Sequence, residues 1–183
     1  GRRSANPVDQ PMGPGGSRSR SLGAGRVTPD ARVERPPRVA VIGAAQASES
    51  EYSDAQALGH ALAKLGAAVV CGGYGGVMEA AARGAAEAGG LTIGILRGSR
   101  GEDANPWIQV PLPTGLGEAR NALVVAGAEV AVAVGGSWGT LSEIALAKKM
   151  GLDVGTLGLP PAGDLDLPAL QDPSAAAHWA LER

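Results

Sequence analysis

Two glycine-rich segments have the composition and position of phosphate-binding turns. Gly72–Gly76 and Gly135–Gly139 each follow a short apolar run and precede a run with helical spacing. A helix start leaves backbone N–H groups without partners and carries about half an elementary charge. Glycine lets an anion approach these groups without meeting a Cβ atom. The two segments predict a shared anion site; the competing interpretation is that their glycines only form tight turns.

Two charged residues have positions that suit such a site. Arg120 lies early in a helical segment, and its guanidinium group can bind a phosphate through two parallel hydrogen bonds. Glu143 lies one turn into the helix after the second glycine segment, where a carboxylate can stabilise an oxocarbenium-like transition state or exchange a proton. Alternatively, Arg120 forms an ordinary ion pair, and Glu143 caps its own helix through the capping-box spacing of Thr140–Glu143. Trp138 either stacks on a base or covers the core.

Several other chemistries are disfavoured by the sequence. No Gly-x-Gly-x-x-Gly motif follows the first strand, and no Gly-Lys-Ser/Thr occurs, which argues against dinucleotide and P-loop sites. The lysines, Lys64, Lys148 and Lys149, fall late in helices, so a pyridoxal phosphate Schiff base is not expected. No Cys/His cluster has metal-ligand spacing, and we expect neither a metal site nor a required cofactor.

Alternating strands and helices position these residues. The patterns predict strands over residues 39–43, 67–71, 91–96, 108–113, 130–134 and 154–157. They predict helices over residues 53–65, 77–88, 116–126 and 140–150, and a short last helix capped by Asp172. The first of these helices is expected to begin at the capping-box spacing of Ser53–Gln56. We predict a three-layer, Rossmann-like, doubly wound and mostly parallel α/β sheet with helices on both faces, whose strand-to-helix turns share one ligand-binding edge.

Composition predicts a single folded domain after a tail. Residues 1–37 are rich in Arg, Pro, Gly and Ser and are expected to be disordered, whereas residues 38–183 are expected to form one Rossmann-like nucleotide-binding domain. Residues 1–38 hold eight arginines against three acidic residues, a charge of +5 that leaves −7 on the rest of the chain. The acidic body, and a tail without aromatic residues, make nucleic acid an unexpected partner.

The compartment is predicted from one cysteine and from the hydropathy pattern. Cys71 is the only cysteine, which fits a reducing compartment. No apolar run reaches the ~18 residues that span a bilayer. We therefore expect a cytoplasmic protein without a membrane partner.

Three motifs resemble the superfamily that includes the LONELY GUY phosphoribohydrolases and the molybdenum cofactor carrier proteins. They are Gly72–Ala80, Thr114–Arg120 and Gly139–Ala145, and the resemblance covers about residues 38–159, with the better match to the carriers. It implies a Rossmann-like fold, a homodimer or larger homo-oligomer, and a phosphate site on the two glycine turns. It also implies that the molybdenum cofactor or a nucleotide is the bound ligand. The label "lysine decarboxylase-like", also used for this superfamily, disagrees with the placement of the lysines.

The hydrolases of this superfamily cleave the N-glycosidic bond of cytokinin or adenosine 5′-monophosphates, and Arg120 and Glu143 match their catalytic Arg and Glu. This chain departs from their Pro-Gly-Gly-x-Gly-Thr-x-x-Glu motif, with Val134 in place of Pro and two residues, Ser137 and Trp138, where one is expected. Asn121 replaces the Lys of their Arg-Lys pair. A misplacement of ~1 Å can lower a rate by ~100-fold, so we favour binding or carrying over hydrolysis. A structural or regulatory homo-oligomer with a vestigial site is the third hypothesis.

The sequence thus predicts one site. Its catalytic candidates are Arg120 and Glu143. Its candidate ligand-binding residues are Gly43, Gly72, Gly73, Gly75, Gly76, Gly117, Arg120, Asn121, Gly135, Gly136, Ser137, Gly139 and Thr140.

Overall fold

The apolar runs of the sequence form a seven-stranded parallel sheet. The computed structural model of the protein describes residues 1, 34–161 and 165–183. Within them the strand order is β4-β3-β2-β1-β5-β6-β7, and every neighbouring pair is parallel. The strands are β1 (Arg38–Gly43), β2 (Ala68–Cys71), β3 (Thr92–Leu96), β4 (Val110–Pro113), β5 (Val130–Val134), β6 (Asp153–Leu157) and β7 (Ala169–Leu170). The predicted tail, residues 1–37, lies almost wholly outside the described residues and stays a prediction.

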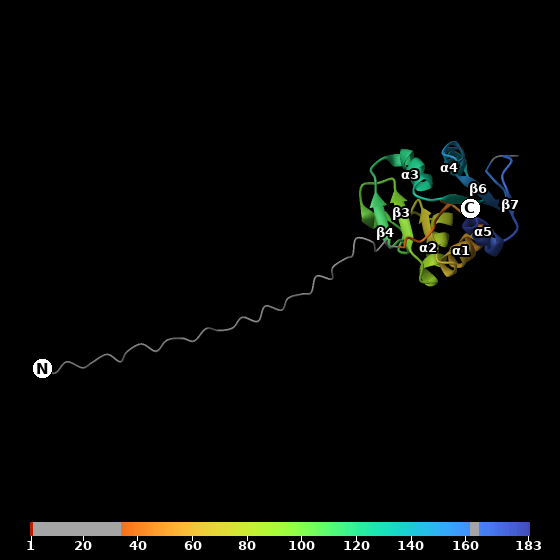
Figure 1. Cartoon of the computed structure of the whole chain (residues 1–183). Coiled ribbons are helices and arrows are strands. Elements are labelled where there is room, and N and C mark those ends of the chain that lie inside the picture. The colour runs from red at the N-terminus through yellow and green to blue at the C-terminus, as the bar shows by residue number, and fades with distance from the viewer. Residues whose placement is uncertain (2–33, 162–164) are drawn as a thin grey trace. The chain divides into compact units, whose positions relative to one another are not determined.

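Helices cover both faces of this sheet (Figure 1). They are α1 (Glu49–Lys64), α2 (Val77–Glu87), α3 (Asn121–Ala126), α4 (Trp138–Lys149) and α5 (Pro173–Leu181), with short 3₁₀ helices η1 (Gly101–Asp103) and η2 (Gly117–Arg120). Val39 and Val41 of β1 pack toward α1, α2 and α5, whereas Ala40 and Ile42 pack toward α3 and α4. Successive side chains of a strand point to opposite faces, so one apolar run serves two cores. The three-layer, doubly wound fold predicted from the sequence is confirmed. No helix among the described residues is both long enough and apolar enough to cross a membrane.

The order of the strands reverses between β1 and β5. From β1 the chain runs outward through β2, β3 and β4, and from β5 it runs the other way through β6 and β7. Open α/β sheets bind ligands at this kind of switch point, outside the carboxyl ends of the strands. The turns that follow β1, β2 and β5 all lie at this edge, because parallel strands end on the same side.

Several predicted boundaries were wrong. Helix α1 begins at Glu49, not near Ser53, because a capping box forms one turn earlier: Ser48 N–H donates to the Glu51 carboxylate at 2.8 Å, and Glu51 N–H donates to Ser48 Oγ at 3.3 Å. Helix α4 begins at Trp138 instead of Thr140, since Ser137 is its N-cap. The segment predicted as one helix over 116–126 opens with η2 before becoming α-helical. The two-residue strand β7 was not predicted, whereas Asp172 caps α5 as expected.

Small residues let α1 and α2 pack closely on one another. The chain contains no Phe, and Ala and Gly fill much of the helix surface that faces the sheet. A Cβ atom at Gly59 of α1 would meet the backbone carbonyl of Ala81, and one at Gly84 of α2 would meet that of Gln56. Backbone atoms cannot move aside as a flexible side chain can, so both positions require glycine.

We therefore expect Gly59→Ala to destabilise the protein, although alanine favours helices. Overpacking of this kind costs about 1–3 kcal/mol and exceeds the gain of roughly 0.5–1 kcal/mol in helix propensity. Chemical denaturation measures the change in the free energy of unfolding. Gly139→Ala is the matched control, since Gly139 is also helical but a Cβ atom there would have no other atom within 4 Å. Equal effects of the two substitutions would contradict this account of the packing.

Candidate functional site

A cavity of about 260 Å³ lies at the switch point of the sheet. It is bounded by the carboxyl ends of β1, β2, β3 and β5 and by η2. Its lining residues are Gly43, Ala45, Tyr74, Met78, Arg97, Glu118, Arg120, Asn121, Ser137, Gly139, Thr140 and Glu143.

Arg120, the last residue of η2, is held almost completely out of solvent, with its side chain 7% exposed. Its guanidinium group lies over Gly72: a Cβ atom there would be 2.6 Å from both Nη1 and Nη2. The guanidinium carbon is also 5.9 Å from the centroid of the Tyr74 ring. Gly72 therefore provides the space that the buried arginine fills.

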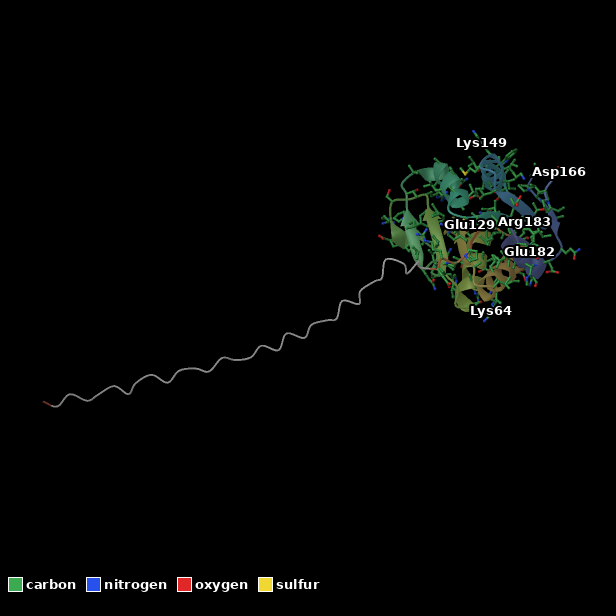
Figure 2. The ribbon with its side chains drawn as sticks, in the orientation of Figure 1. Lys64, Glu129, Lys149, Asp166, Glu182 and Arg183 are labelled. Atoms are coloured by element: carbon green, nitrogen blue, oxygen red, sulfur yellow. The ribbon has the colours of Figure 1, made fainter. Side chains whose placement is uncertain are left out.

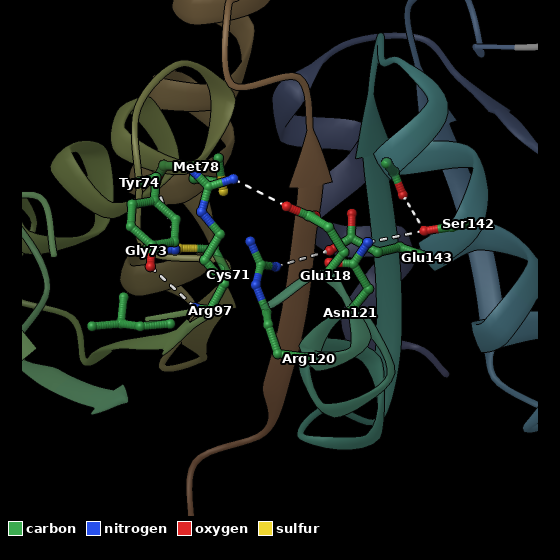
Figure 3. Close-up of polar contacts among 12 residues, drawn as sticks. Cys71, Gly73, Tyr74, Met78, Arg97, Glu118, Arg120, Asn121, Ser142 and Glu143 are labelled. Atoms are coloured by element: carbon green, nitrogen blue, oxygen red, sulfur yellow. Dashed lines mark hydrogen bonds and ion pairs between the residues drawn. The ribbon is translucent and has the colours of Figure 1, made fainter. Parts of the chain in front are cut away.

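Glu143 is the acidic neighbour of this arginine. Arg120 Nη1 and Glu143 Oε1 are 3.5 Å apart, and the Glu143 side chain is 8% exposed (Figure 3). A contact of this length is at the outer limit of a hydrogen bond. Arg120 Nε has no hydrogen-bond partner in the described part of the chain. Buried charges in proteins are normally paired and hydrogen-bonded, so this guanidinium has unused capacity to bind an anion.

Burial has a large effect on Glu143. Loss of solvent raises the pKa of its carboxyl group to about 7, with the nearby Arg120 opposing the rise and Glu118 adding to it. A carboxyl group that titrates near neutral pH can both accept and donate a proton, which is the property required of a general acid or base.

Cys71, beneath the same turn, behaves differently. Its thiol is fully buried, donates to the carbonyl oxygen of Met78 at 3.6 Å and accepts from Gly73 N–H at 3.4 Å. Burial raises the pKa of this thiol to about 11, so it stays protonated at neutral pH and is not an activated nucleophile.

The start of α4 supplies backbone donors on another wall of the cavity. Ser137 caps the helix, and its N–H donates to Thr140 Oγ1 at 3.2 Å. Gly136 has a φ of +138°, and a Cβ atom there would lie 2.7 Å from the Cβ of Thr140. This tight turn sets the first turn of α4 against the cavity, where its N–H groups lack intrahelical acceptors.

Asn121 braces the two elements that carry the charged pair. Its side-chain amide donates to Ser142 Oγ at 2.9 Å, and that hydroxyl donates to the carbonyl oxygen of Gly139 at 2.7 Å (Figure 3). The start of α3 is thereby tied to the first turn of α4. This link fixes the position of Arg120 relative to Glu143.

The first glycine turn contributes less than the second. Val77 N–H, at the start of α2, donates to the carbonyl of Ala44 at 3.0 Å, so a protein oxygen already takes one of the donors of this helix start. A Cβ atom at Gly76 would meet the backbone of Ala44 and Ala45. Of this turn and the first residues of α2, only Tyr74 and Met78 line the cavity.

Comparison with known proteins places this architecture in a family. The model of the SLOG cluster4 family matches residues 36–176, which is most of the chain. The chain belongs to the SLOG cluster4 family. An uncharacterized protein of Archaeoglobus fulgidus is 37% identical over 145 residues, covering 79% of this chain and 94% of that protein.

Two solved structures similar to this SLOG cluster4 protein are those of a molybdenum cofactor binding protein and a molybdenum cofactor carrier protein. The molybdenum cofactor binding protein of the phototrophic bacterium Rippkaea orientalis has a TM-score of 0.76 and 32% identity, covering 82% of this chain and 98% of that one. The molybdenum cofactor carrier protein of Chlamydomonas reinhardtii has a TM-score of 0.74 and 32% identity, with coverages of 81% and 98%. The resemblance to the carrier superfamily inferred from the three motifs is confirmed.

The cavity of this SLOG cluster4 protein contains half of the residues predicted from the sequence. Gly43, Arg120, Asn121, Ser137, Gly139, Thr140 and Glu143 line it. Gly72, Gly73, Gly75, Gly76, Gly117, Gly135 and Gly136 do not. At most positions of the second group a Cβ atom would come closer than 3.0 Å to a neighbouring atom, so these glycines make room for their neighbours.

Two alternative interpretations of individual residues were wrong. Glu143 does not cap α4, because that helix begins five residues earlier, at Trp138, and Thr140 accepts the capping hydrogen bond. Trp138 does not cover the core, since its side chain is 86% exposed.

The lysines lie away from the site, as expected. All three are exposed, and none lines the cavity. Figure 2 shows Lys64 and Lys149 at the periphery of the folded unit. The described residues also contain no group of three or more His, Cys, Asp or Glu that could hold a metal ion.

Four residues that line the cavity with polar, aromatic or thioether side chains were not predicted from the sequence. They are Tyr74, Met78, Arg97 and Glu118. Arg97 follows the carboxyl end of β3, at the edge where ligands bind. The same rule that selected the glycine turns could have selected it. Glu118 lies two residues before Arg120, but nothing in its spacing indicates that it turns toward the cavity.

The raised pKa of Glu143 predicts a pH-dependent effect on stability. The folded state holds this proton more tightly than the unfolded chain, so the burial of Glu143 becomes increasingly unfavourable as the pH rises from 4.5 through about 7. Glu143→Gln should therefore raise the free energy of unfolding at pH 8, by on the order of 3 kcal/mol at most, and change it little at pH 4.5.

Chemical denaturation at the two pH values measures this difference. Glu182→Gln, at the exposed end of α5, is the control for a change in overall charge. An effect of Glu143→Gln that is the same at both pH values would contradict the raised pKa of Glu143.

Proposed function

We propose that this protein binds and carries a phosphorylated small molecule of nucleotide or pterin type in the cavity beside Arg120. The observation that carries the proposal is the buried guanidinium group, whose Nε has no partner among the described residues and whose contact with Glu143 is long. A phosphate has the charge and geometry to accept from such a group. The similar structures from Rippkaea orientalis and Chlamydomonas reinhardtii, a cofactor binding protein and a cofactor carrier, support the carrier role and make the molybdenum cofactor a candidate ligand.

The proposed ligand is held from two sides. Arg120 provides a buried cation, and the first turn of α4 provides N–H groups and the positive end of its dipole. Gly139, which has open space at its Cα, lets the anion approach these donors. The glycines of the first turn then act by shaping the wall, with Gly72 making room for Arg120.

We expect Arg120→Ala to weaken the binding of AMP by about 10- to 150-fold and to leave the binding of adenosine nearly unchanged, because a charged hydrogen bond contributes about 1.5–3 kcal/mol. Isothermal titration calorimetry with both ligands measures the two affinities. Arg100→Ala is the matched control, since Arg100 is an exposed, ion-paired arginine outside the cavity. Equal losses for AMP and adenosine would remove the phosphate role of Arg120.

A second candidate function is phosphoribohydrolysis. The contact between Arg120 and the carboxyl group of Glu143, whose pKa is raised to about 7, favours this function. Cleavage of an N-glycosidic bond uses a carboxyl group at the ribose. In this reaction AMP and water would give adenine and ribose 5-phosphate, with Glu143 exchanging a proton with the reacting groups.

Incubation with AMP separates the two functions. A carrier is expected to return AMP intact, with no free adenine detected by chromatography after prolonged incubation. Adenine release that Glu143→Ala abolishes, while AMP still binds to the variant, would establish the hydrolase instead.

We also propose that the protein forms a homodimer or larger homo-oligomer. Leu116 directly before η2, Leu123 of α3 and Trp138 at the start of α4 are large apolar residues that remain exposed. Helices α3 and α4 pack next to each other on one face of the sheet, and large apolar side chains exposed on neighbouring elements are typical of a protein interface. A purely structural role, with a vestigial cavity, would leave the oligomer intact but the cavity without affinity for phosphates.

A further inference from the structure

Arg97 is a second arginine in the wall of the same cavity. It follows the carboxyl end of β3 and lines the cavity together with Arg120. Its side chain is 56% exposed, so it lies at the mouth, whereas Arg120 is buried deeper. Figure 3 shows the guanidinium group of Arg97 reaching across to Glu118.

Tyr74 brings the two arginines together. Its ring centroid is 5.0 Å from the guanidinium carbon of Arg97 and 5.9 Å from that of Arg120. The ring is fixed in place, because its hydroxyl oxygen accepts from Arg97 N–H and Gly98 N–H, each at 3.1 Å. Since both distances are measured to one ring, the two cations are separated by no more than the sum of these distances. Both side chains also line the same cavity, so a ligand inside it faces two cations.

The two arginines differ in how firmly their counter-ions hold them. Arg97 Nη1 is 3.0 Å from Glu118 Oε1, and the Glu118 side chain is 72% exposed. Ion pairs this exposed are weak, because water competes for both partners. An anionic group that enters the mouth of the cavity can therefore displace Glu118 from Arg97. Arg120, which lines the cavity and whose Nη1 makes only a long contact of 3.5 Å with Glu143, is left to bind a different anion deeper in the cavity.

We propose that Arg97 determines specificity by binding a second anionic group of the ligand, so that the cavity prefers ligands with two linked anionic groups, such as a nucleoside diphosphate, over monophosphates. Glu118 competes with this second group for Arg97. This inference rests on the proposed phosphate site, since Arg120 and the start of α4 bind the first group.

Titration with paired probes tests the preference. ADP and AMP form one pair, and inorganic pyrophosphate and phosphate form a second pair that lacks the base. Arg97→Ala should lower the affinities for ADP and pyrophosphate by about 10-fold, as expected for loss of a charged hydrogen bond. It should change the affinities for AMP and phosphate by less than about 2-fold. Glu118→Gln should strengthen the binding of ADP and pyrophosphate, because it removes the competing carboxylate.

The matched control is Arg100→Ala, which removes an exposed, ion-paired arginine three residues away and should change none of the affinities. Suppose that Arg97→Ala weakens the binding of both members of a pair equally, or of neither, and that Arg120→Ala still weakens the binding of AMP. The proposed specificity is then wrong, and the phosphate site itself stands. Loss of the Arg120 effect, or no binding of any probe to the unaltered protein, overturns the phosphate site itself.

Discussion

A guanidinium group buried beside a single loosely held carboxyl group is the constraint around which the site is arranged. Taking a charge out of water costs several kcal/mol, and one long contact to Glu143 recovers only part of that cost. The consequences spread outward from Arg120. Gly72 must lack a side chain to leave room for the guanidinium, and Asn121 must hold α3 against α4 so that the charged pair stays together.

The sheet makes this arrangement possible. Arg120 and Glu143 come from segments that lie on either side of β5 in the sequence, and both segments pack on the same face of the sheet. Its core is made of Val, Ala, Leu and Ile, and the small residues at the crossing of α1 and α2 allow close helix packing without aromatic side chains. Stability therefore comes from tight packing of small groups, which leaves the edge of the sheet available for polar residues.

The sequence predicted the fold well, because strand periodicity and helix caps are local signals. Asp172 followed by proline marked the start of α5 correctly, whereas the capping-box spacing of Ser53–Gln56 marked the wrong start for α1, because Ser48–Glu51 has the same spacing and forms the box. The earlier one forms because it extends the helix by a turn. The proximity of Arg120 and Glu143 could be predicted from the sequence, since both positions map to the ligand-binding edge. The contribution of Tyr74 could not be predicted, because it depends on where the side chains of Tyr74, Arg97 and Arg120 point, and residue spacing does not encode that direction.

The capping box of α1 has a consequence beyond that helix. The carboxyl group of Glu51 caps α1 and also fills the space above Gly135, where any Cβ atom would collide with it. Gly135 opens the turn that leads into α4, so one acidic side chain joins the beginnings of two helices on opposite faces of the sheet. A side chain at Gly135 would therefore have to displace the carboxyl group that caps α1, so a sequence change in the α4 turn also affects the start of α1.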